Sequence, residues 1–294
     1  MRLDDFDPGS IDIEDQRGGG GRKFGLPMGG RSIGCGTIVI ALIASYFFGV
    51  DPSQLIGGLE QVQQQAPASQ SGPQAGGNAS ESCNVDALSK ESCNALSSLN
   101  RTWEPVFQKS NVTFARPKLV FYSQTGSSGC GSAQSAMGPF YCPEDRGIYL
   151  DTDFYQQMER ELGATGAFAR NYVIAHEYGH HIQRLTGVSD QVRSAQSQNP
   201  SQANQLSVRL ELQADCYAGV WAAKNRDLLE PGDMESGLNA ASKIGDDALM
   251  RSAGRRPAEE SFTHGSSAQR MDWLRRGMES GNEDSCDTFA DSRQ

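Results

Sequence analysis

The sequence has little positive charge and few histidines. Its 294 residues contain 26 Lys and Arg against 36 Asp and Glu, a formal net charge of −10, and only four histidines. No basic face or aromatic-studded basic strand is present, so we expect no nucleic-acid partner. The chain also lacks a C-x-x-C pair, which argues against a zinc site built from cysteines.

Apolar residues are scarce over two segments of the N-terminal third. Residues 1–32 are polar and Gly-rich (RGGGGRK), and residues 51–82 are rich in Gln, Gly, Pro and Ser. Segments of this composition do not bury enough apolar surface to form a core. We therefore predict a polar tail over 1–32, a disordered linker over 51–82, and one folded domain over 83–290, which is an ordinary domain size.

A long hydrophobic run occurs once, at residues 33–50 (IGCGTIVIALIASYFFGV). It carries no charge and is long enough for a short transmembrane helix. A cleaved signal peptide is the main alternative, but no A-x-A cleavage site closely follows the run. Basic residues precede it and acidic residues follow it. The positive-inside rule therefore predicts a single-pass membrane protein with a cytoplasmic N-terminus and an extracytoplasmic domain, on the periplasmic or cell-surface side.

Six of the seven cysteines lie outside this run. An even number in an exported domain favours disulfides, although six cysteines permit fifteen pairings. We predict Cys83–Cys93, Cys130–Cys142 and Cys216–Cys286. The alternative is a set of scattered free thiols.

Hydrophobic patterning indicates a few strands followed mostly by helices. LVFY at 119–122 and GIYLD at 147–151 have the composition of strands. Helices are expected from about Thr152, over 168–185, from about Ser201, over 235–249 and over 267–280. The predicted fold class is α+β and mostly helical, with a small β-sheet.

Three of the four histidines lie in VIAHEYGHHIQ, residues 173–183. On a helix, His176 and His180 are four residues apart on one face, so their rings can hold one metal ion. Glu177 lies about 100° further around the helix, where it can take a proton from bound water without being a ligand. The apolar neighbours indicate a partly buried helix, in which histidines without a role are costly. His181 lies off the metal-facing side and is expected at the surface or behind the ligands.

A catalytic zinc normally has three protein ligands and an open position for water. Asp190, in a turn just after the helix expected over 168–185, is one candidate for the third ligand. The segment LELQADCYAG at 210–219 is better placed. Glu211 and Asp215 share a helix face there. Glu211 could complete a site for one Zn²⁺ per chain while Asp215 accepts the free ring N–H of a histidine ligand. An ordinary acidic stripe on a solvated helix is the alternative.

AHEYGHHIQ and ELQADCYAG together resemble the gluzincin arrangement of an H-E-x-x-H helix and an E-x-x-A-D helix, as in the CAAX prenyl protease and HtpX peptidases. With GCGSAQSAMGPFYCPEDRGIYLD and FTHGSSAQRMDWLRRG, they are similar to the neutral zinc metallopeptidase family of membrane-anchored bacterial proteins, in order over roughly 115–290. The resemblance implies a zincin-like fold with zinc on His176, His180 and Glu211. It also implies Glu177 as general base and Asp215 behind a ligand.

Two further segments are candidates for the cleft. His264, in FTHGSSAQR, could donate a hydrogen bond to the oxyanion formed during hydrolysis, a role that a similar Thr-His segment in HtpX-like peptidases supports. Its alternatives are helix capping and core packing. GIYLDTDF could be an edge strand that pairs with an extended substrate, with Tyr149 and Asp151 toward the groove. The alternative is a plain core strand.

We therefore expect a membrane-anchored zinc metalloendopeptidase that acts on protein or peptide substrates. One alternative is a catalytically idle zinc-binding envelope protein, in which the metal only holds two helices together. Another is a zinc amidase that acts on cell-wall peptides. A structural zinc site usually has four protein ligands, whereas only three can be named here, and Glu177 has no purpose in a structural site.

Overall fold

The computed structural model describes residues 1–17, 78–151 and 153–290. The predicted transmembrane segment 33–50 and most of the predicted linker lie outside these ranges. Within them, no helix is both long and apolar enough to cross a bilayer. The last residues assigned to the linker belong to the domain, because helix α3 (Ala79–Cys83) begins there with Asn78 as its N-cap.

A four-stranded sheet in the order β1-β2-β6-β5 forms the β part of the domain. Its strands are β1 (Asp12–Asp15), β2 (Lys118–Tyr122), β6 (Gly147–Asp151) and β5 (Phe140–Cys142). The first three are parallel, and β5 runs antiparallel to β6. A separate hairpin consists of β3 (Thr125–Ser128) and β4 (Gly131–Gln134).

Residues 1–17 belong to the folded domain, so the prediction of a separate tail over 1–32 was wrong for this part. Strand β1 pairs with β2, with Ile13 opposite Leu119. The side chains of Met1 and Ile11 are buried in the core. Composition averaged over the whole segment conceals these few apolar contacts. They are sufficient to attach residues 1–17 to the domain, because the neighbouring strand also holds the backbone of β1.

This pairing also constrains the orientation in a membrane. Because β1 is hydrogen-bonded to β2, residues 12–15 and 118–121 lie on the same side of any bilayer. A single crossing between them would separate the two strands. The predicted orientation, with a cytoplasmic N-terminus and the domain on the other side, is therefore incompatible with this sheet.

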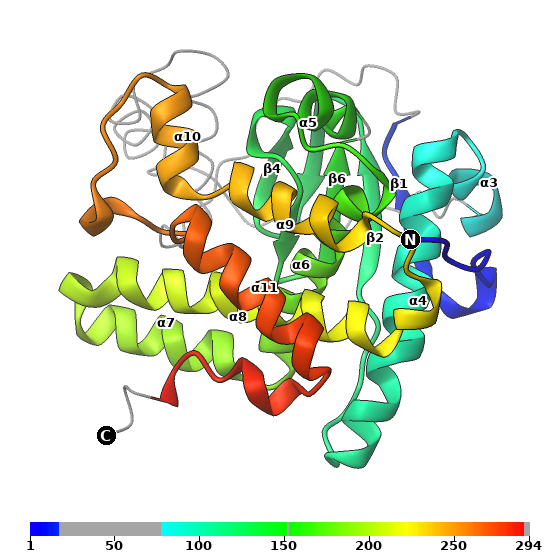
Figure 1. Ribbon diagram of the computed structural model, residues 1–294. Coiled ribbons are helices and arrows are strands. Elements are labelled where there is room, and N and C mark those ends of the chain that lie inside the picture. The colour runs from blue at the N-terminus through cyan, green and yellow to red at the C-terminus, as the bar shows by residue number, and fades with distance from the viewer. Residues whose placement is uncertain (18–77, 152, 291–294) are drawn as a thin grey trace, which may run out of the picture.

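Helices form most of the described domain, as predicted for a mostly helical α+β fold. Besides α3 they are α4 (Ala87–Lys109), α5 (Phe154–Leu162), α6 (Ala167–Leu185), α7 (Val188–Gln198), α8 (Ala203–Lys224), α9 (Asp233–Lys243), α10 (Asp246–Ser252) and α11 (Ser267–Ser280). In Figure 1, α4 runs along one side of the sheet, and α7 and α8 lie side by side below it. Helix α8 packs against both α6 and α11.

The helix predictions held best where the ends carry clear signals. Helix α11 matches its predicted range, because Ser266 and Gln269 form a capping box and Gly281 ends it in the left-handed conformation. The helix predicted over 235–249 is two helices, divided at Gly245. A side chain at Gly245 would collide with the backbone of Ser267, and the chain turns there. Helix α4 was not predicted, because serines and an asparagine are interspersed with the apolar residues of its buried face and obscure the hydrophobic pattern.

Helices α6 and α8 approach closely because a glycine faces the crossing point. A Cβ added at Gly179 would lie 2.7 Å from the Cα of Ala214. The same holds between α8 and α11, where a Cβ at Gly219 would lie 2.2 Å from the Leu274 carbonyl oxygen. No side chain fits at either glycine. The short distance between α6 and α8 brings side chains of α8 within reach of the histidines on α6.

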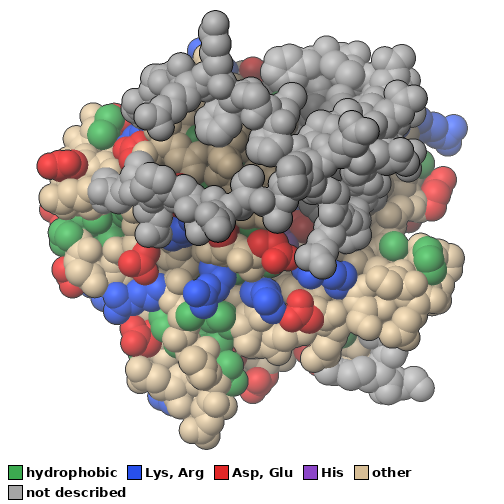
Figure 2. All heavy atoms as spheres, turned by 180° about the vertical axis from the view of Figure 1, so that it is seen from behind, with side chains coloured by type: hydrophobic (Ala, Val, Ile, Leu, Met, Phe, Trp, Pro, Cys, Tyr) green, Lys and Arg blue, Asp and Glu red, His purple; other side chains and the backbone are tan. Residues whose placement is uncertain are grey.

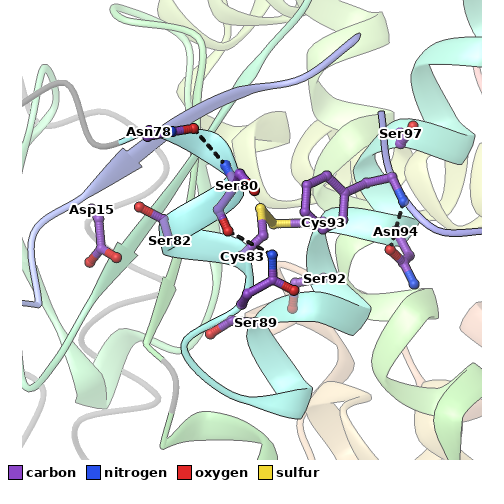
Figure 3. The surroundings of a disulfide bond; sticks show 12 residues. Asp15, Asn78, Ser80, Ser82, Cys83, Ser89, Ser92, Cys93, Asn94 and Ser97 are labelled. Atoms are coloured by element: carbon purple, nitrogen blue, oxygen red, sulfur yellow. Dashed lines mark hydrogen bonds between the residues drawn. A yellow bond between two sulfur atoms is a disulfide. The ribbon is translucent and has the colours of Figure 1, made fainter. Parts of the chain in front are cut away.

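Three disulfides join different elements of the domain, and they are the three predicted pairs. Cys83–Cys93 links α3 to α4 (Figure 3), and Cys130–Cys142 links the β3–β4 turn to β5. Cys216–Cys286 links α8 to the C-terminal 3-10 turn Glu283–Cys286. It spans 70 residues, so it restricts the unfolded chain most, by about 4 kcal/mol in the chain-entropy model.

Charges of both signs share the surface. Figure 2 shows the face opposite to that of Figure 1, where Lys and Arg side chains are interspersed with Asp and Glu outside the grey atoms. This part of the face is neither a continuous basic surface nor a continuous acidic one.

Candidate metal centre

The three predicted ligands come together between α6 and α8. The rings of His176 and His180 lie on one face of α6 with their centroids 4.9 Å apart. Glu211 of α8 completes the group, with Oε2 3.1 Å from His176 Nε2 and Oε1 3.5 Å from His180 Nε2. One potential ligand atom from each residue lies within 4.8 Å of the other two. Two imidazole nitrogens and a carboxylate oxygen so placed fit a zinc ion with one coordination position left open.

Asp215 lies behind His176, as predicted. Its Oδ1 accepts hydrogen bonds from His176 Nδ1 at 2.8 Å and from the Tyr172 hydroxyl at 2.6 Å. An ionised carboxylate only accepts hydrogen bonds, so Nδ1 of His176 carries a proton, and Nε2 is the ring nitrogen that would bind a metal. Asp215 is fully buried, which excludes the alternative of an acidic stripe on a solvated helix.

Arg270 of α11 forms a buried ion pair with Asp215, a contact that was not predicted from the sequence. Its Nε donates to Oδ2 at 2.8 Å and its Nη2 donates to Oδ1 at 2.9 Å, a two-pronged pair with both side chains buried. Burial would raise the pKa of Asp215, but the charge of Arg270 and then His176 outweigh it and lower that pKa to about 2. No spacing rule connects an arginine on a third helix to this aspartate.

The pKa values of Glu211 and Glu177 are shifted in opposite directions. Burial alone would raise the pKa of Glu211, but the rings of His180 and His176 hold it well below its usual range. The pKa of Glu177 is raised by burial, which its neighbours only partly offset. The side chain of Glu177 makes no hydrogen bond to any residue in the described ranges, and 8% of the residue is exposed. It is therefore a carboxylate available to take a proton.

His264 lies beside the α8 segment that carries Glu211. A Cβ added at the neighbouring Gly265 would lie 3.3 Å from both Val208 and Leu212, and the charge of His264 helps to lower the pKa of Glu211. Asp246 orients this segment. Its Oδ1 lies 3.0 Å from His264 Nδ1, and its Oδ2 accepts the backbone N–H groups of residues 263, 264 and 265. Asp246 was missed because it was assigned to the interior of a longer helix.

His181 is buried, and it lies neither at the surface nor behind the ligands, the two positions that were predicted. Its Nε2 donates to the Ala115 carbonyl at 2.7 Å, and the Tyr141 hydroxyl lies 3.0 Å from its Nδ1. Burial lowers the pKa of His181 to about 4, so the ring is neutral at pH 7. It joins α6 to β5 and has no part in the metal site.

The predicted substrate strand was also wrong. Strand β6 pairs with β2 on one side and β5 on the other, so it has no open edge. Tyr149 and Asp151 are both buried, with the Tyr149 hydroxyl donating to Asp145 and Asp151 accepting from the Gln124 amide. The edge strands of this sheet are β1 and β5, and β5 packs against α6. Asp190, the alternative third ligand, pairs instead with Arg184 at the surface.

A family model described as "putative neutral zinc metallopeptidase" matches residues 5–289. The protein titled "Uncharacterized protein YpfJ" from Escherichia coli (strain K12) is 44% identical over 293 residues, which cover 96% of this chain and 97% of that protein. "Uncharacterized protein Mb2605" from Mycobacterium bovis is 40% identical over 206 residues, 66% of this chain and 68% of that protein.

No solved structure matches the chain. The family match extends over nearly the whole length and includes both helices that carry the three ligands. The chain therefore belongs to the putative neutral zinc metallopeptidase family.

Proposed function

We propose that this protein is a zinc metalloendopeptidase that holds one zinc ion per chain on His176, His180 and Glu211. The observation that carries the proposal is the convergence of these three side chains, with the buried carboxylate of Glu177 on the same helix. The family supports zinc as the metal and a peptide bond as the target.

The chain's own groups divide the work of hydrolysis. A zinc ion bound here would lower the pKa of a water molecule towards neutrality and polarise the scissile carbonyl. Glu177 takes the proton from the attacking water and passes it to the leaving amine. Its raised pKa brings it closer to neutral pH, where a carboxylate exchanges protons most effectively. Asp215 and Arg270 hold the ring of His176 in place meanwhile.

We assign to His264 the stabilisation of negative charge on the substrate carbonyl oxygen. Asp246 holds Nδ1 of its ring, which leaves Nε2 to face the substrate. A hydrogen-bond donor fixed in advance stabilises developing charge without having to reorganise. An extended peptide would add to β5, the edge strand that packs against α6.

The three disulfides support placing the domain outside the cytoplasm, because such bonds persist in oxidising compartments. Attachment to a membrane through residues 33–50 is also a proposal, and it rests on the hydrophobicity of that segment alone. The pairing of β1 with β2 requires the chain before and after this segment to lie on the same side of the membrane.

Metal removal tests the proposed activity directly. We expect the purified full-length protein to contain about one zinc per chain and to cleave peptides from a denatured-protein digest, as monitored by mass spectrometry. A strong chelator should abolish cleavage, and one equivalent of zinc should restore it. A protein that binds zinc stoichiometrically but cleaves no peptide would favour the catalytically idle reading and refute the peptidase.

Replacing His264 with alanine should lower kcat by about 100-fold with little change in KM, because the charge that it stabilises exists only in the transition state. Asp246→Asn should lower kcat less, since the ring remains but is held less firmly. Zinc content should be native in both variants. A native kcat for His264→Ala would rule out this role.

A further inference from the structure

His180 has a hydrogen-bond partner of a different kind from that of His176. Nδ1 of His180 lies 2.9 Å from Oε1 of Gln183, one turn further along α6. Gln183 is fully buried. A glutamine amide can present either oxygen or nitrogen to a ring, so Gln183 alone does not determine which nitrogen of His180 carries the proton.

Contacts at the far end of the amide remove this ambiguity. Nε2 of Gln183 donates to the Leu210 carbonyl at 2.7 Å and to Oε1 of Gln213 at 3.1 Å. Nε2 of Gln213 donates in turn to the Cys286 carbonyl at 3.0 Å. Backbone carbonyls only accept hydrogen bonds, so both amide nitrogens must face them. The oxygen of Gln183 is thereby turned to His180, whose Nδ1 must be the donor.

We propose that Gln183 is a positioning residue that fixes His180 with its proton on Nδ1 and its Nε2 directed to the metal, and that Gln213 links it to the Cys216–Cys286 tether. The inference rests on the proposed zinc site. The two histidines then have different hydrogen-bond acceptors. Nδ1 of His176 donates to the charged carboxylate of Asp215, and Nδ1 of His180 donates to the neutral amide of Gln183. Hydrogen bonds to a ligand's second ring nitrogen set its tautomer and direction.

The disulfide holds the acceptor at the end of the relay. Cys286 is bonded to Cys216, which follows Asp215 on α8. The chain just beyond is held on the same helix, because the Thr288 hydroxyl donates to the Arg209 carbonyl at 2.8 Å. Gln183, Gln213 and both cysteines are buried, so water competes little for these amides. The C-terminal segment therefore supports the metal ligand without touching the metal.

The test measures zinc affinity of the full-length protein by competition with a chelator, and the ring nitrogens of His180 by long-range ¹H–¹⁵N NMR of the zinc-loaded form. Gln183→Leu should weaken zinc binding by about 10- to 100-fold and change the His180 ring signals from the native Nδ1–H pattern. Gln213→Leu should weaken binding less than tenfold, because the Leu210 carbonyl still orients Gln183. A native affinity and an unchanged ring pattern in Gln183→Leu would overturn the proposal.

Two controls separate this role from general destabilisation. Asn100→Leu removes another buried amide, which bridges Tyr178 and the Ser10 carbonyl, and should leave zinc affinity unchanged. Replacing Cys83 and Cys93 with serine should do the same.

Replacing Cys216 and Cys286 with serine should weaken zinc binding about as much as Gln213→Leu. A variant that combines the two serine substitutions with Gln213→Leu should bind zinc no more weakly than either variant alone, because both changes act through one relay. Equal weakening by the two cysteine pairs would refute the link to the tether. Wild-type protein that binds no zinc would refute the proposed function itself, independently of any variant.

Discussion

Glu177→Gln is expected to lower kcat/KM for peptide cleavage by about 10²- to 10⁴-fold while the protein keeps its zinc. The amide has nearly the shape of the carboxylate but cannot accept a proton from water at neutral pH. Glu177 contributes no ligand atom to the group formed by His176, His180 and Glu211, so metal affinity should remain native. Steady-state kinetics and metal analysis of the same preparation measure the two effects.

Glu211→Gln is the matched comparison, because it makes the same chemical change at a ligand. We expect it to lose zinc as well as activity. Near-native turnover in Glu177→Gln would show that another group takes the proton. An unchanged cellular role of the Glu177→Gln protein would favour the alternative of a catalytically idle zinc-binding protein.

Arg270→Met is expected to lower the free energy of unfolding by about 3–5 kcal/mol. The methionine fills similar space but leaves the carboxylate of Asp215 buried without its countercharge. The His176 ring and the Tyr172 hydroxyl still donate to Asp215, but they do not replace the two hydrogen bonds and the charge of the guanidinium. Urea denaturation at neutral pH measures the loss.

Two variants identify the cause of this loss. Arg275→Met removes an exposed ion pair with Asp272 on the same helix and should change stability by less than about 1 kcal/mol. Adding Asp215→Asn to Arg270→Met should recover part of the lost stability, because the unpaired charge disappears. If Arg270→Met lowered the free energy of unfolding no more than Arg275→Met, the buried ion pair with Asp215 would not be stabilising the fold.

Local spacing predicted the parts of the site that lie on single helices. His176, Glu177 and His180 are fixed relative to one another by the geometry of α6, and Glu211 and Asp215 by that of α8. Tyr172 and Gln183 also follow helical spacing, four residues before His176 and three after His180, and that signal could have found them. The three predicted cysteine pairs, out of the fifteen pairings that six cysteines permit, are confirmed.

Contacts between residues on different helices and strands could not be predicted from local spacing. Arg270 and Asp246 reach the site from α11 and α10, and nothing in their local sequence distinguishes them from surface charges. Strand β1 was mistaken for part of a polar tail, because its pairing with β2 depends on a partner about a hundred residues away. The substrate strand was misassigned because a sequence does not show which strand ends at the edge of a sheet.

The amino-acid sequence by itself determined the chemistry available: two imidazoles and three carboxylates in helical register, and six cysteines to hold the domain. The tertiary structure alone decided their use, because Gly179 lets α8 approach α6 until Glu211 meets both rings. It also supplied Arg270, Asp246 and the Gln183–Gln213 relay from other elements. Helix periodicity acts over a few residues, whereas the energies of buried charges and amides depend on whatever the fold places beside them.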